Sequence, residues 1–208
     1  MPKKSEISYH DITPELAIDL LKEGNRRFLE NNQTEKDLQS QVRITSKKPH
    51  AFALVLSCFD SRLSSELIFD LGIGDIFNIR IGGNIINEDI IGSMEFACTK
   101  GGIKLILVMG HTLCEAVKGA CDQIDLGSLT ALTNKIQPAI YSVKTPEGTD
   151  RSSKNEEFVN SVAKKNVEIS KANIIQQSSI MRKMIESGEI CLVGAMYNIR
   201  DGQVKFGI

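Results

Sequence analysis

Ala51-Phe52-Ala53-Leu54-Val55-Leu56-Ser57-Cys58-Phe59-Asp60-Ser61-Arg62 is an apolar run that ends abruptly in side chains able to bind a metal. A second run of the same kind, Ile103 to Met109, leads into Gly110-His111-Thr112-Leu113-Cys114. Both runs are short and nearly continuous in hydrophobicity, as strands covered on both faces are. Each therefore predicts a buried strand that carries reactive side chains at its carboxyl end.

The residues between these two runs predict how the strands are arranged. They hold a third short apolar run, Ile76 to Ile81, and two segments with helical spacing, Ser64 to Leu71 and Asp89 to Lys100. The order strand, helix, strand, helix, strand predicts an α/β fold with a parallel sheet. The first and last of these strands then end at the same edge, where open α/β sheets place their active sites.

Four side chains beyond the strand ends form a candidate metal site. In an extended segment residues two apart point to the same side, so Cys58 and Asp60 can face one point. We place His111 and Cys114 on the first turn of a helix, where residues three apart share a face. Two thiolates, one imidazole and one oxygen form a tetrahedral set typical of zinc, and the soft sulfur ligands favour zinc over magnesium or calcium.

Asp60 is a candidate for two roles. Closed structural zinc sites usually take four Cys or His ligands, whereas the fourth candidate here is a carboxylate next to Arg62. An arginine two residues further on can hold Asp60 in a bidentate ion pair, which would draw the carboxylate off the metal and free the fourth position for water. We take Asp60 and Arg62 as the candidate catalytic pair and leave open whether Asp60 also binds the metal.

Cys58-x-Asp60-Ser61-Arg62 followed by Gly110-His111-x-x-Cys114 resembles the paired motif of the β-class carbonic anhydrases. The resemblance extends over nearly the whole chain from about Thr13 onward. It implies a mostly parallel central sheet flanked by helices, with a projecting N-terminal helix and a C-terminal hairpin. It also implies a homo-oligomer, a dimer or a tetramer, in which the N-terminal helix reaches a partner subunit.

The function that the resemblance implies is reversible hydration of carbon dioxide to bicarbonate and a proton. Zinc held by Cys58, His111 and Cys114 would lower the pKa of bound water, and the zinc-bound hydroxide would attack carbon dioxide. Asp60, paired with Arg62, would orient this nucleophile. Two other functions stay open, namely a related zinc hydrolase of carbonyl sulfide or carbon disulfide, and an inactive zinc-binding homologue.

The chain departs from the family pattern at three places. Glu115 follows the second cysteine where the family has a glycine, and Ile81 stands where the family often has an asparagine. The nearest match to a family glutamine that precedes the first strand is Lys47 or Lys48. These departures concern the pocket and the reaction rate, and they leave the ligand set intact.

Composition limits the class of protein. The 208 residues, 41% of them hydrophobic, suit a single zinc-binding α/β domain over residues 1–208, with an N-terminal helical arm at about 13–31. A net charge of −1 predicts no broad attraction to nucleic acid or to a membrane surface. The sequence has no apolar run long enough to span a membrane, and Met1 to Glu6 lacks the apolar core of a signal peptide. Five cysteines without a framework spacing favour a reducing compartment, so we expect a cytoplasmic protein.

The remaining segments predict further helices and a hairpin. A helix should start at Thr13-Pro14, with Thr13 as its cap, and run to about Asn31. We expect a loop with a short helical turn over 32–48, a helix from Cys114 to about Ile124 and a helix from Ser128 that ends near Pro138. Helical structure should follow from Glu156 to Ser187, with a break at 173–178. The final strand should run from Ile190 to Asn198 and lead into a hairpin turn at Asp201-Gly202.

Overall fold

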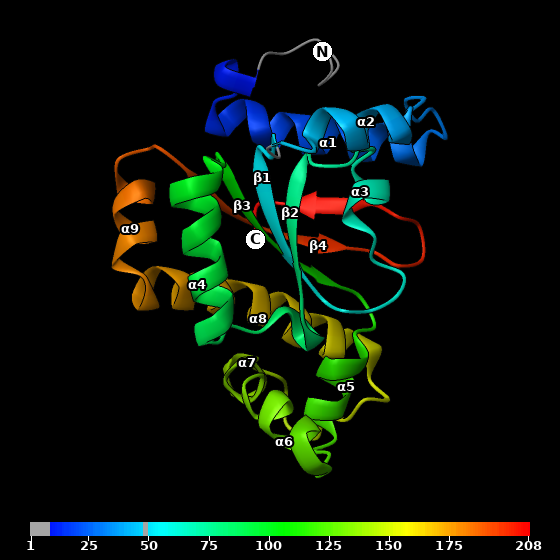
Figure 1. Cartoon of the computed structure of the whole chain (residues 1–208). Coiled ribbons are helices and arrows are strands. Elements are labelled where there is room, and N and C mark those ends of the chain that lie inside the picture. The colour runs from blue at the N-terminus through cyan, green and yellow to red at the C-terminus, as the bar shows by residue number, and fades with distance from the viewer. Residues whose placement is uncertain (1–8, 48–49) are drawn as a thin grey trace.

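Five strands form one sheet in the order β2-β1-β3-β4-β5 in the computed structural model, which describes residues 9–47 and 50–208 (Figure 1). The strands are β1 Ala53–Ser57, β2 Ile76–Arg80, β3 Leu105–His111, β4 Cys191–Tyr197 and β5 Val204–Phe206. Neighbouring strands are parallel except β5, which is antiparallel to β4. The predicted α/β fold with a mostly parallel sheet and a C-terminal hairpin is confirmed. The predictions on Met1 to Glu6 and on Lys48 lie outside the described residues.

The two central strands place the candidate site. Every residue of β1 and of β3 is buried, which explains why both segments are nearly continuous in hydrophobicity. Their apolar side chains belong to one cluster of buried residues. Because Ser57 pairs with Met109 in the parallel register, Cys58, which follows β1, and His111, the last residue of β3, lie at the same edge of the sheet.

Helices surround the sheet and occupy both of its ends. The helices are α1 Pro14–Leu29, α2 Leu38–Thr45, α3 Ser65–Ile68, α4 Glu88–Phe96, α5 Glu115–Cys121, α6 Gly127–Asn134, α7 Gln137–Ser142, α8 Glu156–Gln177 and α9 Ser179–Glu186. Figure 1 shows α1 and α2 at one end of the sheet and α5, α6 and α7 at the opposite end, beyond the carboxyl ends of β1 and β3. The described helices include none with the length and apolar character needed to cross a membrane.

The N-terminal helix is fastened to its own chain. Thr13 caps it as predicted, because its hydroxyl accepts a hydrogen bond from the Leu16 amide at 3.2 Å. The buried side chain of Asn25 donates through Nδ2 to the carbonyl oxygens of Ile68 and Gly202, and its Oδ1 accepts from the backbone amide of Val204. These bonds tie α1 to α3 and to the C-terminal hairpin, and contact with a partner subunit stays a prediction.

The long C-terminal helical segment breaks where the sequence predicts a break. Ser178 separates α8 from α9 with extended backbone angles, and its hydroxyl caps α9 by accepting from the Met181 amide at 3.0 Å. Gly188 follows α9 with φ +75°, the left-handed conformation that favours glycine at a helix end.

Three helix boundaries differ from the prediction. Pro138 lies in the first turn of the separate helix α7, where a proline breaks no hydrogen bond, and not at the end of the helix that starts near Ser128. The helices α3 and α5 end earlier than expected. Each is terminated by a residue in the left-handed region, Asp70 with φ 50° and Gln123 with φ 53°.

Candidate metal centre

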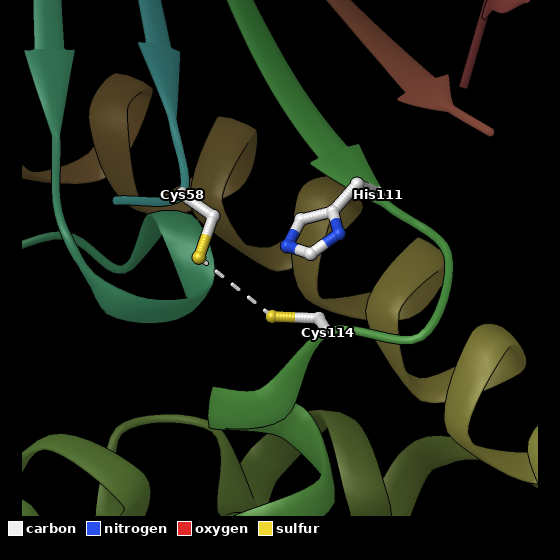
Figure 2. A group of neighbouring side chains, drawn as sticks. All are labelled: Cys58, His111 and Cys114. Atoms are coloured by element: carbon white, nitrogen blue, oxygen red, sulfur yellow. Dashed lines mark hydrogen bonds between the residues drawn. The ribbon is translucent and has the colours of Figure 1, made fainter. Parts of the chain in front are cut away.

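Three buried side chains from separate elements meet beyond the edge of the sheet. Cys58 follows β1, His111 is the last residue of β3, and Cys114 directly precedes α5 (Figure 2). One ligand atom from each side chain lies within 4.8 Å of the others, and the two sulfur atoms are 3.8 Å apart. Figure 2 shows that all three side chains point toward one another. The sequence prediction that these residues converge therefore agrees with the structure.

His111 presents a free lone pair to this group. Its Nδ1 lies 2.9 Å from the carbonyl oxygen of Thr112, which can only accept, so Nδ1 carries the proton and donates. Within the described residues the buried Nε2 has no hydrogen-bond partner. A buried polar atom without a partner costs about 1–3 kcal/mol, and a metal ion would supply the missing partner. The donor set and the unpartnered Nε2 fit a zinc ion.

The connection between His111 and Cys114 corrects one prediction. These two residues do not share the first turn of a helix, because His111 ends a strand and Cys114 occupies the cap position before α5. The chain turns at Leu113, whose φ of 55° lies in the left-handed region. The Leu113 amide donates to Asn160 Oδ1 of α8 at 2.9 Å. Local sequence carries no signal for a left-handed leucine, so both Leu113 and Asn160 were missed.

A hydrogen bond joins the sulfur atoms of Cys58 and Cys114 and shifts the pKa values of the two thiols in opposite directions. A hydrogen bond from Cys114 lowers the pKa of Cys58 against the opposing effect of burial, and the Gly83 amide adds to the lowering. Donating to Cys58, together with burial, raises the pKa of Cys114 well above its ordinary value. The lowered pKa of Cys58 favours a thiolate there, which suits the sulfur pair to a cation.

A glycine turn after β2 supports the Cys58 sulfur. The Gly83 amide lies 3.4 Å from Cys58 Sγ and donates to it, and the Asn166 side chain of α8 donates to the Gly83 carbonyl oxygen at 2.6 Å. Gly83 has φ 65°, and a Cβ there would lie 2.7 Å from Ile136 Cδ1. Glycine is required at this position both by the backbone conformation and by the close packing.

Asp60 is held by Arg62 and does not belong to the three-residue group. Arg62 donates through Nε to Oδ1 at 2.9 Å and through Nη2 to Oδ2 at 2.6 Å, and its backbone amide also bonds Oδ1. This ion pair lowers the pKa of Asp60, so the carboxylate stays ionised and acts only as an acceptor. Among the described residues, the group that could hold a metal consists of Cys58, His111 and Cys114.

Arg80 at the end of β2 fixes the loop that carries Cys58 and Asp60. Its guanidinium donates through Nε to the Cys58 carbonyl oxygen at 3.3 Å and through Nη2 to the Asp60 carbonyl oxygen. Sequence reasoning assigned no role to Arg80, because its partners are backbone atoms of the loop that follows another strand, β1. An arginine at the end of a predicted strand beside the candidate site was the available signal.

The Asp60–Arg62 pair lies in a cavity of about 420 Å³. The lining residues are Cys58, Phe59, Asp60, Ser61, Arg62, Glu115 and Ala116. Glu115 therefore stands at the cavity, with its side chain 72% exposed and its carboxylate 2.8 Å from Lys118 Nζ. Lys47 is exposed and follows the end of α2.

Comparison with known proteins gives consistent matches over most of the chain. The family model described as carbonic anhydrase matches residues 53–204. Carbonic anhydrase 2 of Mycobacterium tuberculosis is 31% identical over 198 residues, with 91% of each chain covered. The carbonic anhydrase of Mycolicibacterium smegmatis is 28% identical, with 92% of each chain covered.

Solved structures share the fold. The β-carbonic anhydrase CafA of Aspergillus fumigatus aligns with a TM-score of 0.70 at 21% identity, covering 93% of this chain and 89% of that one. The β-carbonic anhydrase CcaA aligns with a TM-score of 0.67 at 26% identity, covering 91% of this chain and 94% of that one.

Proposed function

Since the chain belongs to the β-class carbonic anhydrase family, we propose that it hydrates carbon dioxide reversibly at a zinc ion held by Cys58, His111 and Cys114. The observation that carries this proposal is the buried, unpartnered His111 Nε2, which faces two buried cysteine sulfurs. One imidazole nitrogen and two thiolates are ligands that zinc takes in catalytic sites, where a fourth position stays open.

Hydrogen bonds from neighbouring backbone groups orient His111 and stabilise Cys58 as proposed ligands. The Thr112 carbonyl oxygen fixes the His111 tautomer, because it holds the proton on Nδ1 and leaves Nε2 free. The Gly83 amide bonds the Cys58 sulfur and stabilises negative charge on it. Zinc bound here would supply Lewis acidity, which lowers the pKa of water from about 15.7 toward neutrality.

Asp60 orients the attacking water. The Asp60 carboxylate is ionised, and Arg62 holds it in one orientation. It therefore accepts a hydrogen bond from the water and directs a lone pair of the water oxygen at the carbon atom of carbon dioxide. A bond forms between the water oxygen and the carbon while one C=O bond becomes a C–O⁻ single bond. One water proton passes to solvent, and bicarbonate leaves. We assign Asp60 and Arg62 as the catalytic pair in this reaction.

The proposal extends to assembly and compartment. One chain from the crystal structures of two tetrameric β-carbonic anhydrases of Sordaria macrospora shares this fold, with a TM-score of 0.68 at 19% identity. On that likeness we propose a homo-oligomer, a dimer or a tetramer, with carbon dioxide and bicarbonate as its small-molecule partners. The five cysteines are free thiols, and the Cys58 and Cys114 sulfurs lie 3.8 Å apart. A reducing compartment such as the cytoplasm would keep this pair available to a metal.

The experiment is stopped-flow carbon dioxide hydration with protein of known zinc content. Chelation should abolish turnover, and addition of one equivalent of zinc per chain should restore it. Full zinc occupancy without turnover between mildly acidic and alkaline pH would refute the proposed function.

A further inference from the structure

The carbonyl oxygen that holds the proton on His111 Nδ1 belongs to a peptide group with a second hydrogen bond. The Thr112 carbonyl oxygen accepts from His111 Nδ1 at 2.9 Å, and the N–H of the same peptide group, which is the Leu113 amide, donates to Asn160 Oδ1 at 2.9 Å. A peptide group is planar, so its N–H and its C=O turn together. The direction of this carbonyl therefore depends on Asn160 at one end of the peptide group and on the position of Thr112 at the other.

The side chain of Thr112 holds that other end. Its Oγ1 accepts a hydrogen bond from the Ile199 amide at 3.1 Å and donates to Asn198 Oδ1 at 3.3 Å. The backbone amide of Thr112 donates to the Tyr197 carbonyl oxygen at 3.0 Å. Three hydrogen bonds thus attach this one residue to the end of β4 and to the turn that follows it, and two of them depend on the hydroxyl.

The turn between β4 and β5 is held by hydrogen bonds of its own. The backbone amide of Asn198 donates to the Gln203 carbonyl oxygen at 2.9 Å, and the Asn198 carbonyl oxygen accepts from the Gly202 amide at 2.8 Å. The Asn198 side chain donates through Nδ2 to Asp201 Oδ2 at 2.7 Å. The Gly202 carbonyl oxygen accepts from the buried Asn25 side chain of α1. The Thr112 hydroxyl is therefore bonded to a turn whose position is fixed.

We propose that Thr112 is a positioning residue, whose hydroxyl attaches His111 to the turn between β4 and β5 and so holds the imidazole in the orientation and tautomer that zinc binding requires. The hydroxyl acts through the Thr112 carbonyl, which keeps the proton on Nδ1 and leaves Nε2 free for a metal. This inference rests on the proposed function, because it takes His111 as a zinc ligand.

The first test compares the zinc affinities of two Thr112 variants by competition with a chromophoric chelator. Thr112→Val keeps the shape of the side chain and removes the hydroxyl. It should bind zinc about threefold to tenfold more weakly, the factor that one neutral hydrogen bond contributes. Thr112→Ser keeps the hydroxyl and should retain most of the affinity.

Thr130→Val in α6 is the matched control. Thr130 Oγ1 likewise accepts from a backbone amide, that of Leu126 at 2.8 Å, and donates to a side-chain oxygen, Asp125 Oδ1, at 2.9 Å. The substitution therefore removes hydrogen bonds of the same kind from a segment that carries no proposed ligand. Zinc affinity in Thr130→Val should equal that of the unmodified protein.

A second measurement separates the positioning of His111 from a general loss of stability. In the cobalt-substituted protein, the paramagnetic ion shifts the Nδ1–H proton of a bound imidazole away from other proton resonances, so NMR can follow its exchange with water. The hydrogen bond to the Thr112 carbonyl oxygen protects this proton. Exchange should be about threefold to tenfold faster in Thr112→Val, and it should be unchanged in Thr112→Ser and in Thr130→Val.

Asn198→Ala is a second variant, which removes the acceptor of the Thr112 hydroxyl and leaves Thr112 in place. It should also weaken zinc binding. In the double variant its effect should add only in part to that of Thr112→Val, because both substitutions remove the same attachment. Fully additive losses would show two independent effects and would contradict the proposal.

Three further results would overturn the proposal. One is an unchanged zinc affinity in Thr112→Val, and another is an equal loss of affinity in Thr130→Val. The third is an Nδ1–H exchange rate that Thr112→Val leaves unchanged. None of these measurements needs turnover, so a protein that shows the expected changes but does not hydrate carbon dioxide would support this inference and refute the proposed function. A protein that binds no zinc would refute both.

Discussion

Asn160 of α8 accepts a hydrogen bond from the Leu113 amide at 2.9 Å and thereby fixes the turn that separates His111 from Cys114. Leu113 occupies the left-handed region with φ 55°, which costs a non-glycine residue about 1–3 kcal/mol. The surrounding structure must stabilise such a turn, and Asn160 supplies one bond for that purpose. The relative position of two proposed metal ligands thus depends on a helix far along the chain.

Asn160→Ala should lower zinc affinity. Loss of the bond to Leu113 frees the turn, and loss of such a supporting contact typically costs about 10- to 100-fold in metal affinity. Competition with a chromophoric chelator measures this change. Asn160→Asp keeps an acceptor oxygen and should retain most of the affinity. Unchanged zinc affinity in Asn160→Ala would show that the turn holds without Asn160.

Asp60→Asn should lower turnover without lowering zinc content. The amide cannot act as an ionised acceptor, so carbon dioxide hydration should fall by about 100-fold or more. The zinc content, measured by mass spectrometry of the purified protein, should stay at that of the unmodified chain, because Asp60 pairs with Arg62. A marked loss of zinc in Asp60→Asn would instead identify Asp60 as a ligand.

Gly83→Ala should destabilise the fold by about 1–3 kcal/mol, because the new methyl group meets Ile136 and the backbone has positive φ. Gly92→Ala is the matched control. Gly92 lies in α4, and a Cβ there would meet no atom within 4 Å. Alanine should stabilise α4 at that position by about 0.5–1 kcal/mol. Equal effects of the two substitutions on denaturant unfolding would contradict the packing seen at Gly83.

Asp70 should make folding stability depend on pH. Its carboxylate is fully buried and bonded to Arg27, Lys36 and Thr34. Burial alone would raise its pKa, but the hydrogen bonds from Lys36 and Arg27 outweigh burial and lower it. A lowered folded-state pKa gives stability that is complete above the unfolded value of about 3.9 and is lost as pH falls through the folded value.

Asp70→Asn should therefore cost about 3 kcal/mol near neutral pH, because it leaves the Arg27 and Lys36 cations without their carboxylate. The cost should shrink as pH falls below about 4. Arg26→Gln breaks exposed ion pairs with Glu23 and Glu30 and should change the free energy of unfolding little, because solvent screens exposed pairs. Urea unfolding at several pH values measures both variants. A cost for Asp70→Asn that stays constant with pH would contradict this interpretation.

The sheet and the approach of Cys58 to His111 were predictable because their signals are local. The buried strands β1 and β3 show as apolar runs, and parallel pairing then brings Cys58 and His111 to one edge. The turn at Leu113 was not predictable, because its stability depends on Asn160 in α8. The role of Arg80 was missed for the same reason, since it bonds the backbone of a neighbouring loop.

Some helix boundaries also could not be predicted from the local sequence. Asp70 and Gln123 end α3 and α5 in the left-handed conformation, although neither is a glycine. For Asp70 the structure gives the reason, because its side chain is held by Arg27 and Lys36 and its backbone conformation is fixed with it. Long-range contacts of this kind override local propensity and leave no pattern in the neighbouring sequence.

X-ray absorption at the zinc edge, on active protein of known zinc content, examines the proposed ligand set itself. Coordination by Cys58, Cys114 and His111 predicts two sulfur atoms at about 2.3 Å and one imidazole nitrogen at about 2.0–2.1 Å, with one further light atom. A shell without sulfur, or with three or four sulfur atoms, would contradict a zinc site formed by these three residues.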